Sequence, residues 1–214
     1  SVETDEQIIT SVPLLREAIS YVAHTAIRTR GTIGGNVAHA DPSAEIPTVL
    51  VALGGEIVAS SSNGDRTIAA KDFFLGAFFT ELDEREIIKL IRIPKEPENS
   101  GSAFVEFAPR HGDFAIVGIA AVISQNDAGD IDSVRLVVAG VDGKPLDVSS
   151  EAHSLIGKEN VTLDSFDEVA QNVFKRVEPG GDIHASEDYR RELSQTLTVK
   201  ALNLAWKRLG GSNE

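Results

Sequence analysis

The first half of the chain predicts two helices separated by a polar segment. Apolar residues recur at helical spacing over residues 11–27, which predicts an amphipathic helix. Residues 30–41 hold glycine, asparagine and aspartate and contain no long apolar run, so they predict a loop. The apolar run 46–53 predicts a short helix, and Gly54 and Gly55 mark its end.

Strand-like segments follow this helix. Residues 56–59 and 66–69 flank a run of turn-forming residues, 61–65, and together they predict a β-hairpin. Residues 86–93 are rich in β-branched side chains and predict a further strand, which stops at Pro94.

A linker then divides the chain. Residues 95–101 have the sequence Lys-Glu-Pro-Glu-Asn-Ser-Gly, a composition typical of connections between domains. We therefore predict one domain at residues 1–97 and a second at residues 102–209. The pattern of the second domain predicts strands at 103–108, 115–124 and 132–141 and helices at 163–177 and 186–209. Strands joined by short turns and followed by helices predict an α+β fold with an antiparallel sheet.

Charge and composition exclude several classes of function. The chain has 20 Lys plus Arg against 33 Asp plus Glu, a net charge of −13, which argues against a nucleic-acid partner. Cysteine is absent, which excludes cysteine-held metal sites or clusters on this chain and fits a cytoplasmic location. No stretch approaches the ~20 apolar residues of a membrane span. The histidines show no metal-ligand spacing and no catalytic triad is visible, so we predict neither a metal site nor catalytic residues.

The segment most suited to ligand binding is Arg28–Pro47. Gly34 and Gly35 lie between the polar side chains of Thr32 and Asn36, and glycine lets backbone N–H groups approach a ligand closely. Such a cluster suits a ligand with many oxygens, for example a dinucleotide. It is not the Gly-x-Gly-x-x-Gly fingerprint of doubly wound sheets. Taken alone, the glycine pair favours a plain tight turn.

A family resemblance changes this interpretation. The segment RGTIGGN at residues 30–36, followed by AHADPSAE at 38–45, resembles the FAD-binding subunit of the molybdenum hydroxylases, which are enzymes of the carbon monoxide dehydrogenase and xanthine dehydrogenase type. Similar segments are FVEFAPRHGDFAIVGIAA at 104–121, DIHAS at 182–186 and YRR at 189–191. These segments occur in the family's order over most of the chain. The implied fold is the second subdomain of a PCMH-type FAD-binding domain, followed by the C-terminal domain of the flavoprotein subunit.

The resemblance also implies the cofactor contacts. The second FAD-contacting loop of the family matches Thr32, Ile33, Gly34, Gly35 and Asn36. An acidic FAD contact matches Glu45, and an apolar contact of the xanthine-oxidising branch matches Ile88. Val105 stands where that branch has a lysine, so this contact is not carried over. Nothing before Thr32 resembles the family's first FAD loop, Ala-Gly-Gly-x-Ser, so this chain matches the family without its N-terminal FAD subdomain.

By the resemblance, the protein is an oxidoreductase subunit that works in a hetero-oligomer. A large subunit carries the molybdenum cofactor, a small subunit carries two [2Fe-2S] clusters, and this chain passes electrons through FAD to an external acceptor. Because only one of two FAD loops is matched, we expect this chain alone to hold FAD weakly. A different hypothesis is that the chain binds no flavin and is an interaction or assembly module of the same complex.

Several other residues have simpler structural interpretations. We expect Arg110 and Asp113 to form a structural ion pair. Phe104 and Phe107 could cover a flavin ring, although core packing is the more common role of phenylalanine. The pair Arg190-Arg191 suits a solvated or interface face of the last helix. In that helix we expect the buried face to be formed by Tyr189, Leu193, Leu197 and Leu204.

Overall fold

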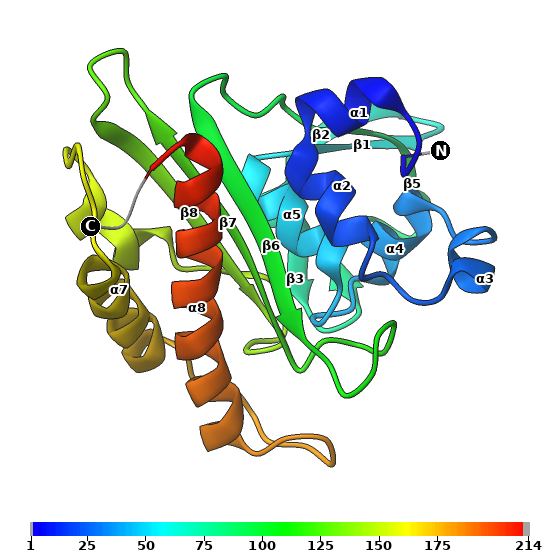
Figure 1. Cartoon of the computed structure of the whole chain (residues 1–214). Coiled ribbons are helices and arrows are strands. Elements are labelled where there is room, and N and C mark those ends of the chain that lie inside the picture. The colour runs from blue at the N-terminus through cyan, green and yellow to red at the C-terminus, as the bar shows by residue number, and fades with distance from the viewer. Residues whose placement is uncertain (1, 212–214) are drawn as a thin grey trace.

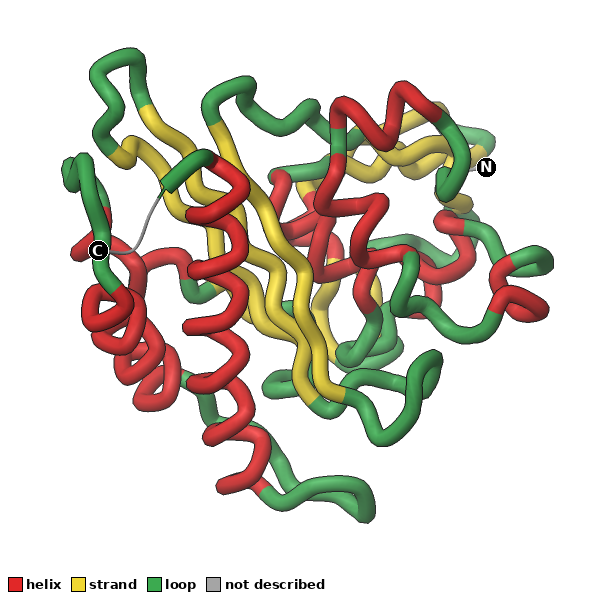
Figure 2. The backbone as a smooth tube through the Cα atoms, in the orientation of Figure 1, coloured by secondary structure: helices red, strands yellow, loops and turns green. Residues whose placement is uncertain are grey.

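The computed structural model describes residues 2–211, and the strands within this range form three antiparallel sheets (Figures 1 and 2). The large sheet has the order β6-β7-β8-β9, with β6 (Ser100–Phe107), β7 (Val117–Gln125), β8 (Ile131–Ala139) and β9 (Leu146–Asp147). A second sheet has the order β2-β1-β5, with β1 (Glu56–Ser61), β2 (Gly64–Ala69) and β5 (Ile87–Arg92). The third pairs β3 (Phe74–Gly76) with β4 (Phe79–Thr80). The α+β class and the predicted hairpin are confirmed.

Helices from opposite ends of the chain cover the two faces of the large sheet (Figure 1). On one face lie α7 (Leu163–Arg176) and α8 (Glu187–Leu209), and on the other lie α2 (Pro13–Ile19) and α5 (Glu45–Leu53). Residues of β7 alternate between the two cores: Ile119 and Ile123 belong to the first, Ala120 and Val122 to the second. A central strand covered on both faces is mostly apolar, and in β7 the run from Val117 to Ile123 is buried without a polar side chain.

Two predictions for the N-terminal half are wrong. The single helix predicted over 11–27 is two short ones, α2 and α3 (Thr25–Arg28), and a further short helix, α1 (Glu6–Ser11), precedes them. Pro13 has no backbone N–H to continue α1, and Ala23 has a φ of 46°, so the chain turns at both places. The loop predicted over 30–41 contains a helix, α4 (Ile33–His39). The short helix α6 (Ala70–Phe73) and the 3₁₀ helix η1 (Ser149–Leu155) complete the fold.

The buried face of α8 also differs from the prediction. Of the four residues expected to form it, Leu197 is buried, Leu193 and Leu204 are partly buried, and Tyr189 is 40% exposed. The buried positions include the small residues Ser194, Ala201 and Ala205. They let the helix approach β6 so closely that a side chain at Gly101 would overlap the Ala205 carbonyl. Among residues 2–211, no helix has the length and apolar character needed to cross a membrane.

Candidate functional site

Two adjoining cavities lie beside α4. The first, called the α4 cavity, has a volume of about 670 Å³ and is lined by apolar side chains from α2 to α5 together with the start of α4. The second, called the Glu45 cavity, has a volume of about 600 Å³ and reaches from α4 to the loops before β7 and α8. The two cavities share the lining residues Val22, Ile27, Asn36 and His39. They therefore form one continuous candidate site.

The start of α4 places Gly35 at the wall of the α4 cavity. The Thr32 side chain caps the helix by accepting a hydrogen bond of 2.9 Å from the Gly35 N–H. Gly34 and Gly35 lie in the first helical turn and neither has a positive φ, so the tight turn favoured by the glycine pair is wrong. One turn on, the buried Oδ1 of Asn36 has no hydrogen-bond partner in the described part of the chain. An orphaned acceptor beside a cavity fits a polar ligand that donates to it.

The Glu45 cavity contains a buried carboxyl group at the start of α5. Glu45 is only 6% exposed, and burial raises its pKa to about 7, with the Asp41 carboxylate adding to the increase. Burial likewise raises the pKa of Glu106 on β6 to about 8, with Glu45 as a second cause. The Glu106 Oε2 atom is buried and has no described hydrogen-bond partner. Near neutral pH Glu106 is mostly protonated and Glu45 is present in both forms, so these carboxyl groups can donate hydrogen bonds as well as accept them.

Arg190 forms the far wall of the Glu45 cavity, where the prediction of a solvated face is wrong. The side chain lines the cavity and its residue is 7% exposed. Its Nη1 donates to the carbonyl oxygens of Ile116 (2.6 Å) and Gly140 (3.0 Å), and its Nη2 donates to Asp182 (2.6 Å). Arg191 differs: it is partly exposed and its guanidinium lies 5.7 Å from the Phe174 ring centroid.

The structure brings together most, but not all, of the cofactor residues that the resemblance implies. Four of them line the α4 cavity: Thr32, Ile33, Gly35 and Asn36. Asn36 and Glu45 line the Glu45 cavity. Gly34 lies in α4 between lining residues but lines neither cavity, and Ile88 on β5 packs against the core instead.

Some lining residues had not been assigned to the site. Phe114, Asp182 and Arg190 belong to segments that carry the family resemblance, and that signal could have found them.

Phe104 is buried in the core against the Tyr21 ring, while Phe107 is 39% exposed. Within the described chain, Arg110 and Asp113 share a backbone hydrogen bond and no ion pair, so that prediction is wrong.

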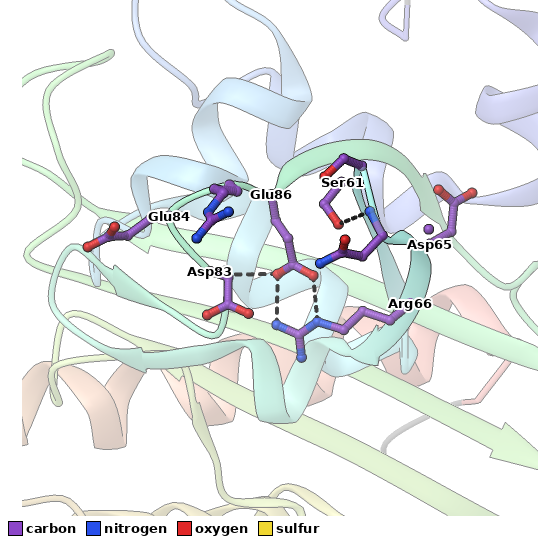
Figure 3. Close-up of a pocket in the computed structure, with 10 residues that line it drawn as sticks. Ser61, Asp65, Arg66, Asp83, Glu84 and Glu86 are labelled. Atoms are coloured by element: carbon purple, nitrogen blue, oxygen red, sulfur yellow. Dashed lines mark hydrogen bonds and ion pairs between the residues drawn. The ribbon is translucent and has the colours of Figure 1, made fainter.

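A third cavity shares no lining residue with this site and has a different character. This hairpin cavity, of about 630 Å³, is lined by residues 61–66 of the β1–β2 turn and residues 83–86 before β5. At its centre Arg66 and Glu86 form a bidentate ion pair with two contacts of 2.8 Å (Figure 3). Glu86 also accepts a hydrogen bond from the Asp83 N–H. Over residues 2–211, no group of three or more His, Asp and Glu side chains is arranged to hold a metal ion.

Comparison with family models gives two adjoining matches. Residues 1–96 match the FAD binding domain in molybdopterin dehydrogenase. Residues 102–205 match the CO dehydrogenase flavoprotein C-terminal domain.

Curated relatives and solved structures agree with these matches. The chain is 33% identical over 211 residues to the 6-hydroxypseudooxynicotine dehydrogenase complex subunit alpha of Paenarthrobacter nicotinovorans, covering 99% of this chain and 71% of that one. It is 32% identical over 197 residues to the carbon monoxide dehydrogenase medium chain of Hydrogenophaga pseudoflava, covering 92% and 68%. The crystal structure of the latter enzyme superposes with a TM-score of 0.91 at 31% identity, covering 97% of this chain and 71% of that chain. The relatives are thus subunits of oxidoreductase complexes.

Proposed function

This chain belongs to the family of FAD-binding subunits of molybdenum hydroxylases, and on that basis we propose that it transfers electrons within such an enzyme. In this proposal it receives electrons from [2Fe-2S] clusters on a small subunit and delivers them to an external acceptor. A large subunit carries the molybdenum cofactor and hydroxylates the substrate. The complex works in the cytoplasm, the compartment that the lack of cysteine fits.

The observation that supports the proposal is the joined pair of cavities with unsatisfied polar groups. Their lining includes residues 32, 33, 35, 36 and 45, which the family resemblance implies as FAD contacts. The buried Asn36 Oδ1 offers an acceptor, and the carboxyl group of Glu45 offers a donor or an acceptor. A ligand with many hydroxyl and N–H groups fits this set.

Within the proposed site, this chain's residues bind and orient the cofactor. FAD supplies, when bound, a ring system that takes up and releases electrons, chemistry that side chains do not offer. The N–H groups at the start of α4 and the side chains of Thr32 and Asn36 bind its polar part. Glu45 can accept or donate a hydrogen bond at the cavity wall. The apolar contact that the resemblance implies for Ile88 lies outside both cavities. The apolar walls from Val22 and Ile27 keep water away from the bound group.

The test is the visible spectrum of the protein and of its complex. We expect the complex purified through this chain to carry FAD stoichiometrically, and the isolated 214-residue chain to bind added FAD weakly. In stopped-flow experiments the complex should pass electrons from reduced clusters to an acceptor. A Gly35→Val complex should keep reducible clusters but lose this last step. A flavin-free native complex would contradict the proposal and favour the interaction module.

A further inference from the structure

Arg190 joins three backbone segments that are distant in the sequence. Its Nη1 donates to the carbonyl of Ile116, where β7 is about to begin, and to that of Gly140, just after β8. Its Nη2 donates to the Asp182 carboxylate in the loop before α8. The Asp182 Oδ1 atom in turn accepts hydrogen bonds from the N–H groups of His184 (2.8 Å) and Ala185 (2.9 Å). One side chain thus fixes both loops that border the Glu45 cavity.

Arg190 and its three acceptors, called here the Arg190 junction, also reach the wall that contains Glu45, through Gly140. The Gly140 N–H donates a 3.0 Å hydrogen bond to the carbonyl of Pro42, in the turn that leads to Glu45. Gly140 has a φ of +79°, and a side chain there would overlap the Ile116 carbonyl. Only glycine at this position lets the three backbone segments, at Pro42, Ile116 and Gly140, approach this closely. Arg190 is therefore linked to the walls formed by residues 41–45, 112–116 and 182–184, but not to those formed by α4 and residues 22–27.

We propose that Arg190 is a positioning residue for the bound flavin: its hydrogen bonds to Ile116, Gly140 and Asp182 hold the Glu45 cavity in the shape that fits the cofactor. This inference rests on the proposed function. It goes beyond it by assigning a role to a residue that sequence reasoning placed on a solvated or interface face.

The chemistry of the junction requires a guanidinium group. Its acceptors are two carbonyls and one carboxylate on separate segments, and the planar, forked donors of arginine can meet all three at once. A lysine keeps the charge, but all its donors are on one nitrogen, whereas Arg190 uses Nη1 for the two carbonyls and Nη2 for the carboxylate. The Arg190 Nε atom is buried and unpartnered in the described chain, so the junction keeps one polar group unsatisfied. An unpaired buried Nε destabilises the fold. This cost is more readily explained if Arg190 supports a binding site than if it only fills the core.

The first experiment measures hydrogen exchange in the 214-residue chain. In Arg190→Lys we expect peptides covering 113–117 and 182–186 to exchange about tenfold faster, with peptides from β1 and β2 unchanged. Asp182→Asn removes one arm of the junction and should give the weaker, intermediate effect. Arg191→Lys is the matched control and should change neither region. Unchanged exchange in Arg190→Lys, or an equal increase throughout the chain, would overturn the proposal.

The second experiment measures the flavin in the assembled complex. Arg190→Lys should raise the FAD dissociation constant about tenfold and shift the absorption bands and midpoint potential of the flavin that remains bound. Arg191→Lys should change none of these quantities. If exchange becomes faster locally while flavin affinity, spectrum and potential stay as in the wild type, Arg190 serves the fold alone and the inference is wrong. A wild-type complex without flavin would instead refute the proposed function, and the exchange data would still decide what Arg190 holds in place.

Discussion

The hairpin cavity and the Glu45 cavity have similar volumes, about 630 and 600 Å³, and opposite chemistry. In the hairpin cavity the charged groups at the centre bind one another, since Arg66 contacts both Glu86 and Glu81. In the Glu45 cavity the Oδ1 of Asn36 and the Nε of Arg190 are buried without a described partner. Buried unsatisfied groups destabilise the fold, so they persist where a ligand can satisfy them. Cavity volume therefore does not distinguish the two cavities, whereas unsatisfied polar groups in the wall do.

The pKa values of one residue type show the same contrast. Hydrogen bonding to Arg66 lowers the pKa of Glu86 to about 2, whereas burial raises the pKa of Glu45 to about 7. A paired carboxylate at a surface is fixed as an anion. A buried carboxyl without a cationic partner can change its protonation near neutral pH, as groups at functional sites often do.

The largest expected effect is that of Gly35→Val on flavin binding in the complex. A side chain at Gly35 would begin 3.0 Å from Thr32 Oγ1, so it disturbs the cap of α4 and projects from a residue that lines the α4 cavity. We expect FAD affinity to fall by more than about a thousandfold, measured by fluorescence titration. Gly76→Val is the control, because an added Cβ at Gly76 meets no atom within 4 Å and Gly76 lines none of the three cavities. If the Gly35→Val complex bound FAD as well as the wild type, α4 would not be part of the FAD site.

The next effect is a loss of stability as the pH rises. The pKa values of Glu45 and Glu106 are about 7 and about 8 in the folded chain, above the ordinary 4.5, so the folded state binds more protons than the unfolded state. Their stabilising contribution is complete below the ordinary value and is lost as the pH rises through the folded values. For Glu45 the loss is on the order of 3 kcal/mol. Urea unfolding at about pH 5 and about pH 8 measures it.

Matched variants distinguish the pH effect of these two carboxyl groups from that of the acidic residues on the surface. Glu45→Gln and Glu106→Gln should each reduce the pH dependence and stabilise the chain at the higher pH. Glu98→Gln, at an exposed position outside the cavities, should leave the dependence as it is. A wild-type chain that becomes more stable as the pH rises through this range would contradict the assigned protonation.

Local patterns predicted most of the fold, and long-range contacts explain what they did not predict. Strands β7 and β8 and helix α7 follow from apolar spacing and turn residues within each segment. Helix α4 was not predicted because a glycine pair disfavours helix; the Thr32 cap and the complete burial of Val37 override that propensity. Arg190 was placed on a solvated or interface face because the two carbonyls that it binds lie 50 and 74 residues away, where no local pattern can reveal them.

A smaller effect is expected for Asn36→Ala, which should raise the stability of the free chain and lower the affinity of the complex for FAD. The change removes a buried acceptor that has no partner in the ligand-free chain, and alanine favours helix more than asparagine. We therefore expect the free chain to be stabilised by roughly 1 kcal/mol and FAD affinity in the complex to fall about tenfold. Asn63→Ala in the hairpin cavity is the control for binding. Loss of stability together with unchanged binding would mean that Asn36 serves the fold and not a ligand.

The smallest effect is expected for Glu86→Gln, which breaks the central ion pair of the hairpin cavity. Arg66 would keep its contacts with Glu81. The Glu86 side chain is only 8% exposed, but that of Arg66 is 41% exposed, so water screens the pair and its contribution is small. The thermal midpoint should therefore fall slightly, and less in high salt, while FAD binding to the complex stays at the wild-type level. Because the pKa of Glu86 is lowered in the folded chain, the pair's contribution is complete above the ordinary value of 4.5 and is lost as the pH falls from there through about 2. If Glu86→Gln reduced flavin binding as strongly as Asn36→Ala, the hairpin cavity would belong to the site, and unsatisfied polarity would no longer distinguish the two cavities.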